Sequence, residues 1–154
     1  MSGDVLDGLM GHALDEARRA PSHGDVPVGA VVARTVDGEI LAARHNEREI
    51  AHDPTAHAEI LALRDAAHGA GTWRLGGCLL VVTVEPCPMC AGAAVAARLD
   101  VVAFGATDPK AGALGSLYQL GADPRLNHEL TVIDGIRAQE CSALLHEFFT
   151  ARRP

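Results

Sequence analysis

The sequence predicts an α/β fold, in which short strands and helices alternate along the chain. Residues 78–84 and 100–105 are apolar runs of strand length, and residues 88–99 between them form a helical stretch of small apolar residues. Two strands joined through a helix in this way pair in parallel by a crossover connection. Residues 27–34 and 39–45 flank a Val-Asp-Gly turn and predict an antiparallel hairpin.

The first helix is predicted over residues 5–20 because apolar side chains recur there at helical spacing. They are Leu6, Leu9, Met10, Ala13, Leu14 and Ala17. After the hairpin, residues 46–51 form a polar connection. A second helix follows and ends near Gly69, with Asp53 as its expected N-cap and Pro54 as its first helical residue.

The second half of the chain begins with a loop over residues 106–115. Loops at the carboxyl end of a strand are where α/β folds place ligand contacts, although many such loops are only connections. A short helix at 116–120, a last strand at 129–133 and a closing helix at 136–152 complete the prediction. The closing helix is expected to turn inward Cys141, Leu144, Leu145 and Phe148.

Length and composition indicate a globular domain rather than a membrane or secreted protein. A chain of 154 residues with 48% hydrophobic content is long enough for one domain with a substantial core, which we expect to span residues 1–154. It contains no run of about 20 uncharged apolar residues, and its start lacks the basic and apolar segments of a signal peptide. We therefore expect a cytoplasmic protein that makes no membrane contact.

The net charge of −7 argues against general nucleic-acid binding, because sequence-independent affinity comes mostly from basic side chains that neutralise phosphates. Any RNA contact must be local. The most suggestive basic pair is Arg152 and Arg153, which follow Phe148 and Phe149 at the end of the closing helix. An exposed helix end that favours cations through the helix dipole explains the same pair equally well.

The strongest chemical motif is Cys87-Pro-Met-Cys90, combined with His57 earlier in the chain. Pro88 disfavours helical geometry at Cys87 and suits the first helical position, so Cys87 is the expected N-cap and Cys90 the third helical residue. Both sulfurs then lie at the positive end of a helix, where thiolates form readily. With His57, they make the set of ligands that zinc prefers.

Three protein ligands predict a catalytic zinc site. A structural zinc is normally closed by four side chains, whereas a catalytic one keeps a position for water, and Glu59 lies beside it in sequence. Cys-x-x-Cys between a strand and a helix is also typical of thioredoxin-like redox sites, but the added His-Ala-Glu motif favours a zinc nucleobase deaminase. The remaining cysteines, Cys78 and Cys141, are expected to be buried and unreactive.

One part of this site has no explanation in the predicted helix. Residues two apart on an ideal helix lie on different faces, so spacing alone does not bring His57 and Glu59 to one metal ion. A related ambiguity concerns residues 88–99, which are apolar on every side and must be covered on every side. One cover is the sheet, and the other is either a second subunit or the core of the same chain.

The sequence resembles the bacterial tRNA-specific adenosine deaminases, which convert the wobble adenosine of a tRNA anticodon to inosine. Beyond the zinc motifs, the resemblance is carried by residues 25–30 (DVPVGA), 52–60 (HDPTAHAEI), 104–116 (FGATDPKAGALGS) and 126–128 (LNH). It implies a three-layer cytidine-deaminase-like fold with a mixed five-stranded sheet flanked by helices. It also implies a homodimer that binds one Zn(II) per subunit.

The resemblance further implies roles for individual residues. His57, Cys87 and Cys90 hold the zinc, Glu59 shuttles protons and Asn46 hydrogen-bonds the flipped nucleotide. The implied contacts to the tRNA anticodon loop are Asp108, Lys110, Asn127, Phe149, Arg152 and Arg153. In many relatives further basic residues follow the arginine pair, so this chain is expected to bind RNA less tightly or to rely more on its loops.

Two alternative functions stay open at this stage. The same zinc motif serves deaminases of free bases or nucleosides, such as guanine or cytosine. A zinc-stabilised RNA-binding subunit without turnover is the alternative from a different class. The presence of Glu59 argues against the second, because a subunit without turnover has no need of that carboxylate.

Overall fold

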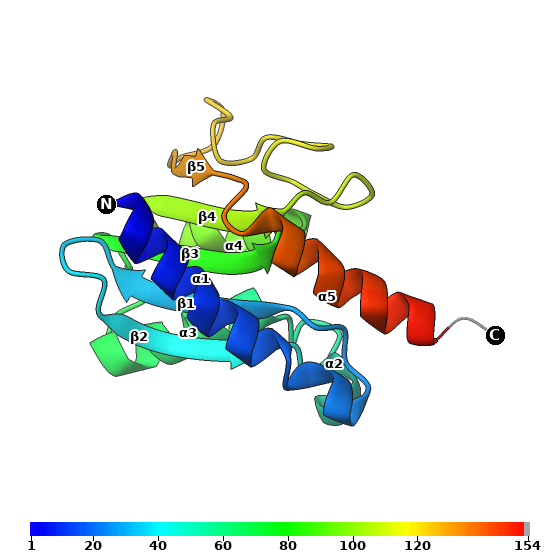
Figure 1. Cartoon of the computed structure of the whole chain (residues 1–154). Helices are drawn as coiled ribbons and strands as arrows, with labels where there is room; N and C mark the ends of the chain where they lie inside the picture. The colour runs from blue at the N-terminus through cyan, green and yellow to red at the C-terminus, as the bar shows by residue number, and fades with distance from the viewer. Residues whose placement is uncertain (153–154) are drawn as a thin grey trace.

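A computed structural model describes residues 1–152 and shows a five-stranded sheet with helices on both faces (Figure 1). The strand order is β2-β1-β3-β4-β5. β1 pairs with β2 and β3 antiparallel, whereas β3–β4 and β4–β5 are parallel, so the sheet is mixed, as expected. The strands are β1 (Gly29–Arg34), β2 (Ile40–His45), β3 (Cys78–Val84), β4 (Val101–Ala106) and β5 (Thr131–Ile133).

Helices cover the two faces of the sheet in separate layers (Figure 1). The helices are α1 (Gly3–Ala17), α2 (Arg48–Ala51), α3 (Ala58–Ala70), α4 (Pro88–Ala96) and α5 (Ala138–Ala151). α1 and α5 pack on one face, against side chains such as Val31 and Val81. α3 and α4 pack on the other, against side chains such as Val32 and Val82. None of these described helices is long and apolar enough to cross a membrane.

The central strand β3 is buried on both faces, which explains its almost uninterrupted apolar sequence. Leu79 points into the layer of α1 and α5, and Leu80 into the layer of α3 and α4. On β1, Gly29 lets α1 approach the backbone closely, because a Cβ atom there would lie 1.8 Å from the Ala13 carbonyl oxygen. The carboxyl end of β3 leads directly to Cys87, the N-cap of α4.

Most elements lie within three residues of their predicted bounds. The hairpin, the strand at 78–84, the parallel crossover and the closing helix are confirmed. The first helix ends at Ala17 instead of Ala20, where a 3₁₀ turn containing Pro21 follows. α4 ends at Ala96, and Arg98 adopts a left-handed backbone conformation that a helix cannot continue through.

Two local predictions are wrong. Asp53 does not cap a helix, because its carboxylate accepts hydrogen bonds from the Thr55 N–H at 2.8 Å and the Thr55 hydroxyl at 2.7 Å and closes a turn instead. The helix begins only at Ala58. Part of the preceding polar connection forms the single-turn helix α2.

The segment 116–120 is likewise not a helix. The N–H of Leu120 donates to the Ala113 carbonyl at 2.9 Å, and a β-bridge joins Leu114 to Gln119. The chain therefore makes a hairpin-like turn here. Its hydrogen bonds run across the turn rather than along a helix axis.

Candidate metal centre and active-site cavity

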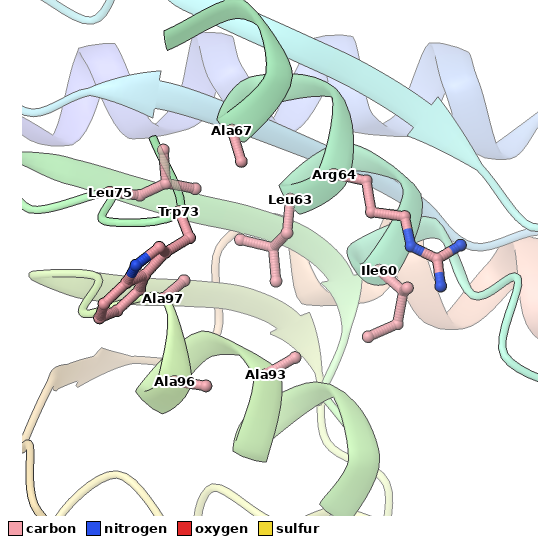
Figure 2. Close-up of a pocket in the computed structure, with 9 residues that line it drawn as sticks. All are labelled: Ile60, Leu63, Arg64, Ala67, Trp73, Leu75, Ala93, Ala96 and Ala97. Carbon is pink, nitrogen blue, oxygen red and sulfur yellow. The ribbon is translucent and has the colours of Figure 1, made fainter. Parts of the chain in front are cut away.

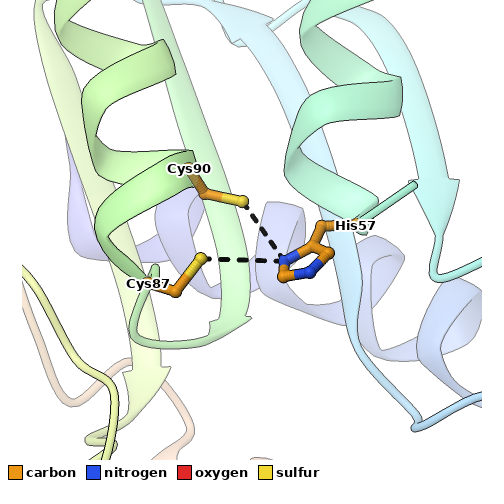
Figure 3. Close-up of side chains that lie close together, drawn as sticks. All are labelled: His57, Cys87 and Cys90. Atoms are coloured by element: carbon orange, nitrogen blue, oxygen red, sulfur yellow. Dashed lines mark hydrogen bonds between the residues drawn. The ribbon is translucent and has the colours of Figure 1, made fainter. Parts of the chain in front are cut away.

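His57, Cys87 and Cys90 come together at one point, although about thirty residues separate the histidine from the cysteines (Figure 3). Their potential ligand atoms all lie within 4.8 Å of one another. His57 Nδ1 is 3.7 Å from Cys87 Sγ and 3.5 Å from Cys90 Sγ. A tetrahedral zinc ion with bonds of about 2.0–2.3 Å holds its ligands about 3.3–3.8 Å apart, so these donors fit zinc in both chemistry and spacing.

Two helix N-termini create this arrangement. Cys87 is the N-cap of α4 with extended backbone angles, Pro88 is the first helical residue and Cys90 the third, as predicted from the proline. His57 is the N-cap of α3 and is also extended, with φ −72° and ψ 149°. The dipoles of both helices place their positive ends at the cluster, which favours thiolates and other anions there.

The position of His57 also resolves the question of how it meets Glu59. The histidine precedes α3 and Glu59 is its second helical residue, so the two are not both on the helix. The rule that residues two apart lie on different helix faces therefore does not apply to them. His57 lines a cavity together with Glu59 and Cys87.

The three donor side chains shift one another's pKa values. A hydrogen bond from the Cys90 thiol, joined by one from His57, lowers the pKa of Cys87 to about 4. The neighbouring Cys87 sulfur and burial raise the pKa of Cys90, and the hydrogen bond to Cys87 raises the pKa of His57. A divalent cation would offset the repulsion between two thiolates, so metal binding should release the Cys90 proton.

Glu59 lies beside the three potential metal donors without being one of them. Its side chain is 3% exposed, and burial raises the pKa of its carboxyl group. The three-donor group does not include it, although it lines the same cavity. A buried carboxyl group with a raised pKa beside a potential metal site is a candidate general acid and base.

The cavity at this site has a volume of about 220 Å³. Its lining consists of Val26, Val28, Asn46, Arg48, His57, Glu59, Val84, Glu85, Cys87, Asp108 and Ala111. Asn46 is held rigidly, because its Oδ1 accepts from the Ala58 N–H at 2.8 Å and its Nδ2 donates to the Val26 carbonyl at 3.2 Å. The same amide therefore fixes the start of α3 and borders the cavity.

A second, larger hollow of about 650 Å³ adjoins the first through Asp108, which lines both. Its lining consists of Asp108, Lys110, Leu145, His146, Phe149 and Arg152. Four of the six residues predicted to contact RNA therefore line this one hollow, namely Asp108, Lys110, Phe149 and Arg152. Asn127 lies on an exposed loop and is in the lining of neither hollow, and Arg153 lies outside the described residues.

Among the polar residues that line these cavities, three were not identified from the sequence, namely Arg48, Glu85 and His146. Glu85 had a signal, since it is a charged residue directly after the apolar strand β3. Burial by itself would raise the pKa of its carboxyl group, but hydrogen bonds from Ser116, Asp108 and Leu114 outweigh burial and lower it. Arg48 and His146 belong to no motif that would have singled them out.

Comparisons with known proteins agree with this site. Residues 5–106 match the family described as the cytidine and deoxycytidylate deaminase zinc-binding region. The chain is 46% identical over 153 residues to the tRNA-specific adenosine deaminase of Bacillus subtilis (strain 168), an alignment that covers 99% of this chain and 92% of that protein.

Two solved structures are similar as well. One, from studies of A-to-I editing by tRNA:A34 deaminases, has a TM-score of 0.85 at 40% identity and covers 90% of this chain and 99% of its own. The other, from work on a guanine deaminase of Nitrosomonas europaea, has a TM-score of 0.79 at 28% identity and covers 94% of this chain and 84% of its own. Both the sheet and the flanking helices are thus shared with deaminases.

The metal centre predicts how cysteine variants behave. Cys87→Ala should weaken zinc binding by at least the roughly 10–100-fold that loss of an outer-shell partner costs, because a direct ligand is removed. Cys78→Ala, which removes a thiol from β3 outside the three-donor group, is the matched control and should keep the zinc content of the parent. Competition with a chromophoric chelator measures both. Equal zinc affinity in the parent and Cys87→Ala would contradict the assignment.

Proposed function

Since the chain belongs to the tRNA-specific adenosine deaminases of the cytidine and deoxycytidylate deaminase family, we propose that it converts the wobble adenosine of a tRNA anticodon loop to inosine. The observation that carries this proposal is the three-donor group with Glu59 in one cavity, in a chain that matches such a deaminase over nearly its whole length. The reaction consumes one water, forms a C6–O bond, breaks the C6–N bond and releases ammonia.

The residues of the cavity divide this chemistry between them. His57, Cys87 and Cys90 would hold the zinc, which when bound supplies the Lewis acidity that makes water nucleophilic at neutral pH. Glu59 takes the proton from the water and delivers it to the leaving nitrogen, as the raised pKa of its buried carboxyl group allows. Asn46 offers a rigid amide to the nucleotide, since both of its hydrogen bonds to the protein fix its orientation.

The adjoining hollow supports an RNA substrate. A cavity of about 220 Å³ admits a single base, so the target nucleotide must leave its stack, and this costs least in a loop. Phe149 lines the larger hollow, is 48% exposed and offers a ring on which a base can stack. Lys110 and Arg152 line the same hollow and supply local positive charge in a chain whose net charge is −7. Asn127 and Arg153 stay predicted RNA contacts.

The substrate class is tested by measuring ammonia release from an RNA stem-loop and from free bases and nucleosides, each assayed separately. A short anticodon stem-loop with adenosine at the wobble position should be deaminated, whereas free adenosine, guanine and cytosine should release ammonia far more slowly. The guanine arm matters because of the similarity to the Nitrosomonas europaea guanine deaminase. Turnover of free adenosine or guanine as fast as the stem-loop would overturn the RNA assignment.

Glu59→Gln separates catalysis from metal binding. The substitution keeps the size of the side chain and removes its capacity to carry a proton, so the rate should fall by about 10²–10⁴-fold. Zinc content, measured by mass spectrometry of the intact holoprotein, should stay at that of the parent. A proportional loss of zinc would instead make Glu59 a metal ligand.

We also propose that the chain forms a homodimer through the exposed face of α4. Small residues along this helix, including Gly92 and Ala96, are exposed and allow another backbone to approach closely. The face continues into an apolar groove between α3 and α4, beside which the indole of Trp73 stands 56% exposed (Figure 2). A second copy is the proposed occupant, because closed twofold dimers are the commonest soluble assemblies and α4 also carries Cys90 of the three-donor group.

Ala96→Glu tests the dimer. A carboxylate in the middle of the proposed interface would be buried without a partner, so the dissociation constant should rise by about 100-fold or more. Ala143→Glu, which places the same charge on an exposed position of α5, is the control and should leave the assembly unchanged. Sedimentation velocity over a range of concentrations distinguishes the two. A monomeric parent would exclude the proposal outright.

Three other expectations accompany the proposed function. They are a single deaminase domain over residues 1–154, one zinc ion per subunit and a location in the cytoplasm, where tRNA would be the substrate. Each stays a prediction. Zinc content per chain, measured on the purified protein, decides the second directly.

A further inference from the structure

Glu85 is a buried carboxylate whose bonds all go to one loop. It follows β3, is 2% exposed and borders the active-site cavity. Its Oε1 accepts hydrogen bonds from the Asp108 N–H at 3.1 Å and from the Ser116 hydroxyl. Its Oε2 accepts from the N–H groups of Leu114 at 3.1 Å and Ser116 at 3.0 Å. A carboxylate has about four acceptor positions, so the loop uses the full capacity of this one.

The loop over residues 106–116 is also shaped to fit this side chain. A Cβ atom at Gly112 would lie 2.3 Å from the Glu85 carboxyl carbon, so the loop backbone passes as close as a residue without a side chain permits. Backbone hydrogen bonds flank the contact, from the Glu85 N–H to the Ala106 carbonyl at 2.8 Å and from the Ala113 N–H to the Pro86 carbonyl at 2.9 Å. The loop is therefore wrapped around the carboxylate.

This loop contains Asp108, the residue that lines both the active-site cavity and the larger hollow beside it. Asp108 lines both, and its own Oδ1 accepts from the N–H groups of Lys110 at 3.0 Å and Ala111 at 3.2 Å. A fixed Asp108 therefore also fixes Lys110, which lines the larger hollow, and Ala111, which lines the smaller cavity. The Asp108 N–H is the donor that Glu85 holds.

We propose that Glu85 is a positioning residue for RNA recognition: it holds the 106–116 loop so that Asp108 and Lys110 stand at the mouth of the cavity and select loop nucleotides. This inference rests on the proposed tRNA deaminase function and deepens it. Glu85 itself touches no reacting atom, because its oxygens are already occupied by the loop. Its effect should therefore appear in RNA binding more than in the chemical step.

Glu85→Gln perturbs this anchor at a definable atom. The amide oxygen can take the place of Oε2 and keep the bonds from Leu114 and Ser116. The amide nitrogen then takes the place of Oε1, where it can donate to the Ser116 hydroxyl but meets the Asp108 N–H donor to donor. The loop should loosen first at Asp108, since one buried N–H group has lost its acceptor.

The experiment combines RNA binding, single turnover and hydrogen exchange on the zinc-loaded protein. In Glu85→Gln, the dissociation constant for the anticodon stem-loop should rise on the order of tenfold, while the single-turnover rate at saturating RNA changes less than about threefold. Amide exchange of peptides covering residues 106–116 should become faster. Glu39→Gln, the same change at the exposed far end of the hairpin, is the control and should match the parent in all three.

The possible outcomes separate this proposal from the function on which it rests. A parent that does not bind the stem-loop overturns the tRNA function and, with it, the selection of RNA by the loop, whereas faster exchange in Glu85→Gln would still support the anchor. Unchanged exchange and affinity in Glu85→Gln overturn the anchor. So does a loss confined to the saturating rate, because that would place Glu85 in the chemistry.

A second variant decides the matter if Glu85→Gln does not fold. Gly112→Ala leaves the carboxylate in place and pushes the loop away from it by steric contact. It should weaken stem-loop binding and speed loop exchange in the same way, at unchanged zinc content. Parent-like binding and exchange in a folded Gly112→Ala protein would contradict the proposal.

Discussion

The site depends on one constraint, the meeting of two helix N-termini at a single point. α3 begins at Ala58 and α4 at Pro88, and the residue before each start supplies a metal donor with an extended backbone. The sheet enforces the meeting, because β3 delivers α4 and the Asn46 side chain at the end of β2 holds the first N–H of α3. Thiolates that would repel each other in isolation are thereby collected at the positive ends of two helix dipoles.

Much of this fold follows from short-range rules. β1, β3 and β4 are mostly apolar because the centre of the sheet is covered on both faces, and the Cys87 cap follows from the effect of Pro88 on its neighbour. The start of α3 could not be predicted in the same way. Asp53 and Pro54 resemble a helix start, but Asp53 forms a turn with Thr55, and the true start depends on Asn46, twelve residues before Ala58.

The loop beside the cavity is also hard to predict from sequence, because its conformation depends on a residue far away in the chain. The sequence predicts a short helix at 116–120, yet the chain turns there, and its conformation depends on Glu85, which lies 31 residues before Ser116. The hollow that joins Asp108 to Phe149 likewise combines a loop and a helix that are far apart in the chain. Such pairings are tertiary, so the sequence motifs identified the candidate metal donors, whereas the proposed RNA contacts came from a family resemblance and their grouping around one hollow came from the structure.

The central claim is a zinc ion held by two sulfurs and one nitrogen with a position left for water. Zinc K-edge X-ray absorption of the holoprotein tests it most directly. The account predicts two sulfur ligands at about 2.3 Å and nitrogen or oxygen ligands at about 2.0–2.1 Å. A third sulfur ligand, a fourth protein side chain on the ion or a purified protein that binds no zinc would contradict it.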